Sequence, residues 1–126
     1  MEKQFLTYIH SKAIKQLGFK EECLGAWHDV EVSTPFLTVR SIKDTQGGYF
    51  TLAPLYQQVF DWFREKQNIH AYIQRTYKEM DIREGFEFYF DNYDLRFVSD
   101  IYDTYEEARF KCIEKLIEKI SSENDL

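Results

Sequence analysis

LYQQVFDWFREK, residues 55–66, is a helical segment that carries more large apolar side chains than one helix face can hold. Val59, Trp62 and Phe63 follow helical spacing, and so do Tyr56, Phe60 and Phe63. We expect the first set to pack on a sheet and on the last helix, and Tyr56 and Phe60 to contact the N-terminal residues. The segment therefore predicts a helix that joins two halves of one domain.

Two residues mark the ends of this helix. Pro54 suits the first helical position, because the amide that proline lacks would have no helical partner there. Asn68 suits the position after the last turn, because asparagine accepts a left-handed backbone conformation. We therefore expect the helix to end near residues 67–68.

Three strands are expected downstream, because residues 69–74, 86–91 and 95–102 each alternate apolar and polar side chains. Phe86, Phe88 and Phe90 form the apolar set of the middle strand. The connections, residues 79–85 and 91–94, are too short for parallel crossovers. The three strands are therefore predicted to form an antiparallel meander.

The last helix is indicated by a capping box, in which Thr104 is the N-cap and Glu107 lies three residues further on. Its apolar side chains recur at helical spacing and predict one buried stripe: Tyr105, Ala108, Cys112, Ile113, Leu116, Ile117 and Ile120. Residues 122–126 are expected to fray as a tail.

The N-terminal part reads as a short helix followed by a β-hairpin. Ser11 is the predicted N-cap of the helix, and Gly18 is the predicted left-handed residue after its last turn. Residues 24–32 and 36–42 are expected as strands, with a break at residues 33–35. Residues 44–48 are expected as a loop, because they combine Asp, Thr, Gln and two glycines.

The predicted fold class is α+β: a three-stranded antiparallel meander with two helices on one face, preceded by a short helix and a β-hairpin. Residues 1–126 are expected to form a single domain. Within it, residues 1–53 hold the N-terminal helix and strands, and residues 54–121 form an α-β-β-β-α unit.

Charge and composition exclude several classes of function. The net charge of −6 comes from residues 54–126, since residues 1–53 balance their charges, and no basic cluster is present to bind nucleic acid. The α-β-β-β-α order is that of double-stranded-RNA-binding domains. However, residues 103–107 are acidic where such domains place lysines.

The expected location of the protein is inferred from two sequence features, the apolar runs and the cysteines. No run approaches the roughly 18 apolar residues of a membrane span. Cys23 and Cys112 lack the spacing of a redox or zinc motif, so a reduced cytoplasmic protein is expected.

Catalytic and metal-binding residues are not indicated by any spacing. His10, His28 and His70 are far apart in sequence, and Cys112 lies in an apolar helix stripe where cysteine acts as a small apolar residue. No phosphate-binding or nucleophile-elbow motif occurs, and no cofactor is expected. The carboxylates between residues 91 and 107 leave a divalent-cation site open as an alternative, although turns and a helix start explain most of them.

Tyrosines interleaved with acidic residues are the candidate binding surface. They lie on or beside the three C-terminal strands: Tyr72, Tyr89, Tyr93, Tyr102, Asp91, Asp94 and Asp100. Tyrosine contributes a large contact area at a low cost in side-chain entropy, so a protein partner is expected there. The open alternatives are that these tyrosines cover the outer sheet face with nothing bound, or that a second subunit covers it.

Several phrases resemble one family. They are AIKQLGF at 13–19 with CLG at 23–25, APLYQQVFDWFREK at 53–66, and YDTYEEA at 102–108 with CIEKLI at 112–117. Together they resemble small uncharacterised proteins common in phages and prophages of Bacteroidetes. The resemblance implies a genomic setting and transfers no catalytic residue.

The leading hypothesis is a non-enzymatic, phage- or prophage-derived protein that acts through protein–protein interaction, or through homo-oligomerisation, without binding nucleic acid or membrane. The alternative is a small hydrolase that uses the carboxylates, with or without a divalent metal. A third hypothesis is an acidic inhibitor that mimics DNA.

Overall fold

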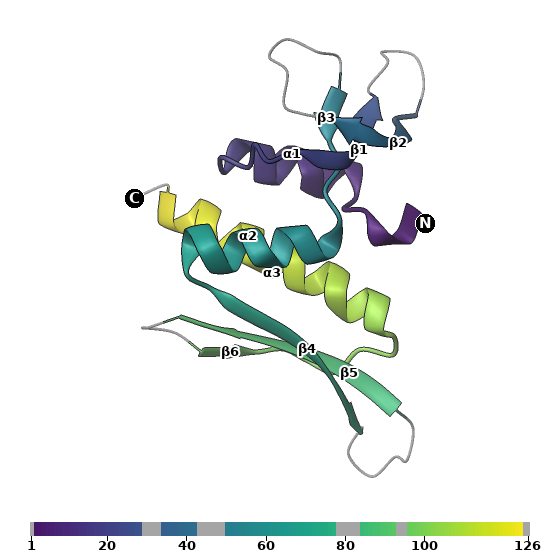
Figure 1. Ribbon diagram of the computed structural model, residues 1–126. Helices are drawn as coiled ribbons and strands as arrows, with labels where there is room; N and C mark the ends of the chain where they lie inside the picture. The colour runs from purple at the N-terminus through teal and green to yellow at the C-terminus, as the bar shows by residue number, and fades with distance from the viewer. Residues whose placement is uncertain (1, 29–33, 43–49, 78–83, 93–95, 125–126) are drawn as a thin grey trace. The chain divides into compact units, whose positions relative to one another are not determined.

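The computed structural model describes residues 2–28, 34–42, 50–77, 84–92 and 96–124. Its elements are η1 (Glu2–Gln4), α1 (Tyr8–Gln16), β1 (Cys23–His28), β2 (Phe36–Ile42), β3 (Phe50–Leu52), α2 (Tyr56–Gln67), β4 (His70–Tyr77), β5 (Glu84–Asp91), β6 (Arg96–Val98) and α3 (Tyr105–Asn124) (Figure 1). These described residues form three α-helices and two three-stranded antiparallel sheets, which confirms the α+β class.

The chain divides into two compact units, which we call the N-terminal unit (Met1–Val59) and the C-terminal unit (Phe60–Leu126). The division falls inside α2. Val59, Trp62 and Phe63 are buried, as their spacing predicts, and Phe60 is half-buried. The expectation that this helix joins two halves of one domain stays a prediction.

The N-terminal unit contains a sheet in the order β2-β1-β3. The expected antiparallel pair of strands is present, with Trp27 of β1 opposite Leu37 of β2. The third strand, β3, was not expected, and it pairs with the other edge of β1 through Thr51. The predicted part of β1 beyond His28, the first residue of the break at 33–35 and the loop at 44–48 lie outside the described residues.

Helix α1 begins earlier than the sequence predicted. Its N-cap is Thr7, whose hydroxyl oxygen accepts from the amide of His10 at 3.3 Å. Ser11 is instead buried inside the helix, where its hydroxyl donates to the carbonyl of Leu6 at 3.4 Å. The prediction of Ser11 as the cap was therefore wrong, because a second hydroxyl residue one turn earlier takes that role.

The end of α1 is the left-handed ending expected at Gly18. Gly18 has a φ of +106°, and its amide donates to Lys15 at 3.1 Å. The amide of Phe19 donates back to the carbonyl of Ile14, also at 3.1 Å, and both side chains are buried. These two bonds satisfy carbonyls that the last helical turn leaves without a partner.

Helix α2 ends as predicted and begins later than predicted. Asn68 has a φ of 54°, the left-handed conformation that ends the helix. Pro54 lies two residues before the first helical residue, Tyr56, so its assignment to the first helical position was wrong. Its carbonyl accepts from the amide of Leu6 at 2.8 Å, which ties the start of the chain to this segment.

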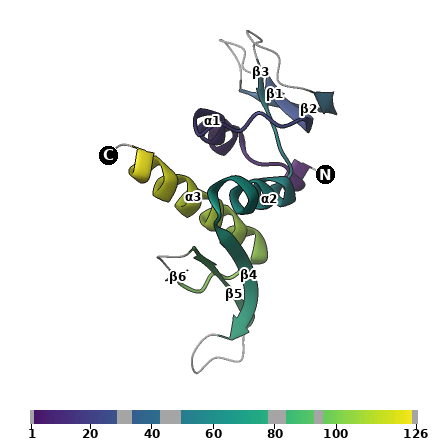
Figure 2. The same ribbon diagram turned by 60° about the vertical axis from the view of Figure 1, so that its left-hand side comes forward.

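The sheet of the C-terminal unit has the order β4-β5-β6, and both pairs are antiparallel. Helix α3 lies over one face of this sheet (Figures 1 and 2). Phe88 and Phe90 of β5 are each 2% exposed, and Phe88 borders a groove that is also lined by residues of α3. Tyr72 of β4, on the opposite face, is 50% exposed. The alternation in sequence thus separates a buried phenylalanine face from an exposed face. Of the predicted turns at 79–85 and 91–94, residues 79–83 and 93–94 lie outside the described residues.

Helix α3 starts where the capping box predicts. The amide of Glu107 donates to the hydroxyl oxygen of Thr104 at 3.1 Å. The buried stripe contains Ala108, Cys112, Ile113, Leu116 and Ile120. Three details differ: Tyr105 is 42% exposed, Ile117 is only half-buried, and the helix continues through Asn124 into the segment expected to fray.

Candidate functional site

The outer face of the C-terminal sheet carries a row of three apolar side chains, of which the outer two are exposed and the central one is half-buried. Tyr72 of β4 lies opposite Tyr89 of β5, and Tyr89 lies opposite Val98 of β6. The two tyrosine rings stack with their centroids 5.1 Å apart and their planes 28° from parallel. We call Tyr72, Tyr89 and Val98 the tyrosine face. Adjacent positions on three strands bring them together, because side chains directly opposite each other share a sheet face.

Polar side chains flank this row on the same face. The side-chain amide of Gln74 donates to the carboxylate of Glu87 at 2.6 Å, across β4 and β5. Asp91 lies opposite Arg96, across β5 and β6. The tyrosine face is therefore an apolar strip between groups of both charge signs, where the sequence had suggested an acidic surface.

The seven residues predicted as a binding surface do not all lie together. Tyr72, Tyr89 and Asp91 share the outer face, since their register positions place them there. Tyr93 and Asp94 lie outside the described residues. Tyr102 and Asp100 line a separate groove beside α3.

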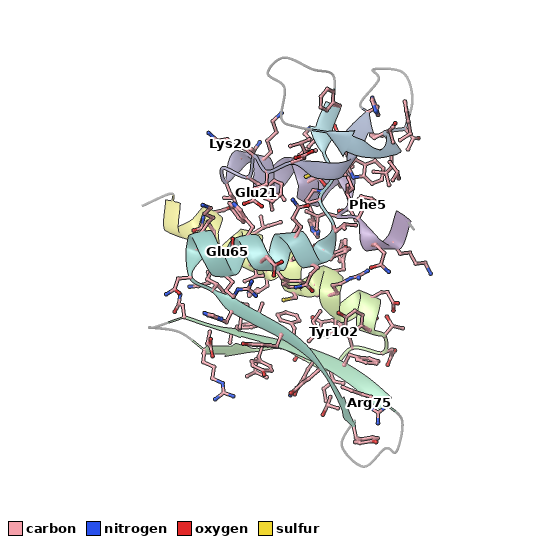
Figure 3. The ribbon with its side chains drawn as sticks, in the orientation of Figure 1. Phe5, Lys20, Glu21, Glu65, Arg75 and Tyr102 are labelled. Carbon is pink, nitrogen blue, oxygen red and sulfur yellow. The ribbon has the colours of Figure 1, made fainter. Side chains whose placement is uncertain are left out.

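The placement of Tyr102 on the outer face was wrong. Its ring lies against Phe88 at 6.2 Å, on the side of the sheet that α3 covers (Figure 3). The amide of Ser99 donates to the carbonyl of Phe88, and the amide of Tyr102 donates to the carbonyl of Phe86. The two donors are three residues apart, whereas the two acceptors on β5 are only two residues apart. This extra residue is a β-bulge, and it moves every later side chain to the opposite face.

The groove beside α3 has a volume of about 520 Å³. Its lining comes from β5, β6, the residues between β6 and α3, and one side of α3: Phe88, Phe97, Val98, Ser99, Asp100, Tyr102, Lys111, Glu114, Lys115 and Glu118. Sequence reasoning missed Lys111 and Lys115, because lysines and glutamates on a helix are typical of its solvated side. Asp100 was predicted from the sequence as a binding residue, but it was grouped with the tyrosines of the outer sheet face instead of with the residues of this groove.

Nucleophilic chemistry at Cys112 is disfavoured by its surroundings. Burial raises the pKa of its thiol from 9.0 to about 12, because the thiolate would lose its hydration. Only the thiolate is a good nucleophile, so this cysteine acts as a small apolar residue of the α3 stripe. Cys23 is also buried, and its thiol lies 3.2 Å from the carbonyl oxygen of Glu21.

Metal binding finds no support in the part of the chain that is described. There, no group of three or more His, Cys, Asp or Glu side chains is placed to hold a metal ion. Asp94, one of the carboxylates considered for this role, lies outside that part. In the same described residues, no helix is both long enough and apolar enough to cross a membrane.

We compared the chain with known protein families, curated proteins and solved structures. A scan of protein-family models and searches of curated proteins and of solved structures found no match to this chain. The candidate sites therefore rest on the geometry of the chain itself.

Proposed function

We propose that this chain is a non-enzymatic protein that binds another protein through the tyrosine face. The observation that carries the proposal is the stacked pair of Tyr72, which is 50% exposed, and the half-buried Tyr89, extended by Val98, which is 54% exposed. The outer sheet face thus keeps a continuous apolar strip in contact with solvent. Such strips on a soluble domain mark interaction sites when a polar rim surrounds them.

The rim chemistry favours a protein as the occupant. Glu87, Gln74, Asp91 and Arg96 offer acceptors and donors of both signs beside the apolar row. This combination of a central aromatic contact and a mixed polar rim matches the anatomy of protein interfaces. A nucleic acid would instead need a positively charged surface.

The strength of binding follows from the size of the strip. The strip consists of three side chains, and even a fully buried aromatic side chain covers only about 150–250 Å², so the strip is smaller than the roughly 800 Å² per partner that stable interfaces bury. A transient complex is therefore expected, in which the two tyrosines contribute most of the affinity.

Two wider expectations belong to this proposal. The resemblance to phage and prophage proteins supports a phage-derived protein in the bacterial cytoplasm. The α-β-β-β-α order, together with the contact of α3 with β4 and β5, supports a meander with two helices on one face.

The test is capture from a lysate of the source cells with four immobilised proteins. These are the wild type, Tyr72→Ser, Tyr89→Ser and the control Tyr77→Ser. Tyr77 is a matched control, because it is a 62% exposed tyrosine of the same strand at a register position that belongs to the other sheet face. We expect one protein to bind the wild type and Tyr77→Ser, and to be lost from both face variants.

Two results would overturn the proposal. One is capture that is the same for all four proteins, or absent from the wild type. The other is a dimer in sedimentation that Tyr89→Ser dissociates, since the occupant of the face would then be a second copy of this chain.

A further inference from the structure

The groove beside α3 has an aromatic wall. The ring of Phe88 lies 5.8 Å from that of Phe97 and 6.2 Å from that of Tyr102, with interplanar angles of 24° and 10°. Three rings in nearly parallel orientation therefore border one cavity. The faces of aromatic rings carry partial negative charge and attract cations.

One cationic side chain of the protein already lies against this aromatic wall. The ammonium group of Lys115 lies 5.2 Å from the centroid of the Phe97 ring. The same group lies 3.4 Å from the carboxylate of Glu118, and the Lys115 side chain is half-exposed while that of Glu118 is exposed. Exposed ion pairs of this kind contribute little free energy, so a competing cation can displace the lysine at a small cost.

The charges around the groove also favour a cation. Lys111 lies 3.5 Å from Glu114, and Lys115 lies 3.4 Å from Glu118, so each lysine is neutralised by the glutamate three residues further on. Asp100 is the remaining charged residue of the lining, and within the described residues it has no ion-pair partner. An anion would face this carboxylate and would have to separate both lysines from their glutamates.

We infer that this groove binds an organic cation, an alkylammonium or guanidinium group, which takes the place of the Lys115 ammonium over Phe97 and pairs with Asp100. The volume of about 520 Å³ fits a lysine or arginine side chain together with adjoining atoms. The site is separate from the tyrosine face, apart from Val98, which borders both.

The experiment is a titration of the ¹⁵N-labelled protein, followed by the amide signals of Phe97, Asp100 and Lys115. The probes are n-butylammonium chloride, the blocked tripeptide acetyl-Gly-Lys-Gly-amide, and sodium butyrate as the anionic control. We expect saturable shifts with the first two probes and none with butyrate. Equal affinity for the two cations assigns the site to the ammonium group alone, and tighter binding of the peptide assigns it to a peptide side chain.

Three variants test the assignment to residues. Asp100→Asn and Phe97→Leu should each raise the dissociation constant about threefold, since each removes one weak contact with the cation. Lys115→Gln should strengthen binding about threefold, because it removes the internal competitor. Asp91→Asn, on the outer sheet face, is the control and should change nothing.

The inference is overturned if no saturable shift occurs with either cation, if butyrate saturates the same signals, or if Lys115→Gln weakens binding. Lys115→Gln replaces a half-exposed helical residue and keeps the fold, so it gives a result even if Phe97→Leu fails to fold. Because none of these variants changes Tyr72 or Tyr89, failure here is distinguishable from failure of the tyrosine face.

Discussion

Tyr72 and Tyr89 lie directly opposite each other on neighbouring antiparallel strands, with ring centroids 5.1 Å apart. The contact holds both rings in place before any partner arrives. Rings that are already ordered lose less side-chain entropy on binding, which favours this pair as a contact surface. The same contact also contributes to the stability of the sheet.

A double-mutant cycle measures that contribution. Tyr72→Ala, Tyr89→Ala and the double variant should show a coupling free energy of about 0.5–1 kcal/mol in urea unfolding, because opposed aromatic pairs stabilise a sheet by that amount. Tyr72→Ala combined with Tyr77→Ala is the control cycle, since these two residues do not face each other. A coupling near zero for Tyr72 and Tyr89 would show that the rings do not interact in solution.

Gly25 of β1 is expected to tolerate no side chain. A Cβ atom there would lie 2.8 Å from the Phe5 ring, which is buried in the N-terminal unit (Figure 3 labels Phe5). Gly25→Ala should therefore destabilise the protein by about 1–3 kcal/mol, measured by urea unfolding. The same change in a Phe5→Leu background should cost less, because the ring edge is gone; an equal cost in both backgrounds would contradict this explanation.

Thr104 is expected to stabilise α3 as its N-cap. Thr104→Ala should lower the free energy of unfolding by about 1 kcal/mol, because the amide of Glu107 loses its acceptor. Thr104→Ser keeps that acceptor and is the matched control. If thermal unfolding shows the same loss for both variants, the hydroxyl is not the stabilising group.

Cys112 should make stability fall in alkaline solution. Its pKa is raised from 9.0 to about 12 in the folded protein, so above pH 9 the unfolded chain releases a proton that the folded chain keeps. The stability advantage of wild type over Cys112→Ala should therefore shrink by about 1.4 kcal/mol between pH 8 and pH 10. Unfolding in guanidinium at the two pH values measures it, and an unchanged difference would mean that the thiol is not desolvated.

The C-terminal elements followed from local patterns, since those patterns are long. Phe86, Phe88 and Phe90 alternate over a whole strand, and the apolar stripe of α3 recurs over several turns. In contrast, β3 has only Phe50, Thr51 and Leu52, which is too short to show a period. The start of α1 was misplaced because Thr7 and Ser11 offer the same capping chemistry one turn apart, and only tertiary contacts choose between them.

Only part of the candidate site could be predicted, because side-chain alternation assigns a face only within a regular strand. Alternation along β4 and β5 places Tyr72 and Tyr89 on one face without any structure. Asp100 and Tyr102 were misassigned because a bulge of one residue changes the face of everything that follows it, and no turn or glycine marks this bulge in sequence. The groove was missed entirely, since it depends on which side of α3 meets β6.

The most direct test of the tyrosine face is the dissociation constant of the captured partner, measured side by side for three proteins by biolayer interferometry. The account predicts that Tyr72→Ser combined with Tyr89→Ser raises the dissociation constant about tenfold or more, while Tyr77→Ser leaves it within about twofold of wild type. Equal constants for the face variant and the wild type, or a larger loss for Tyr77→Ser, would contradict it.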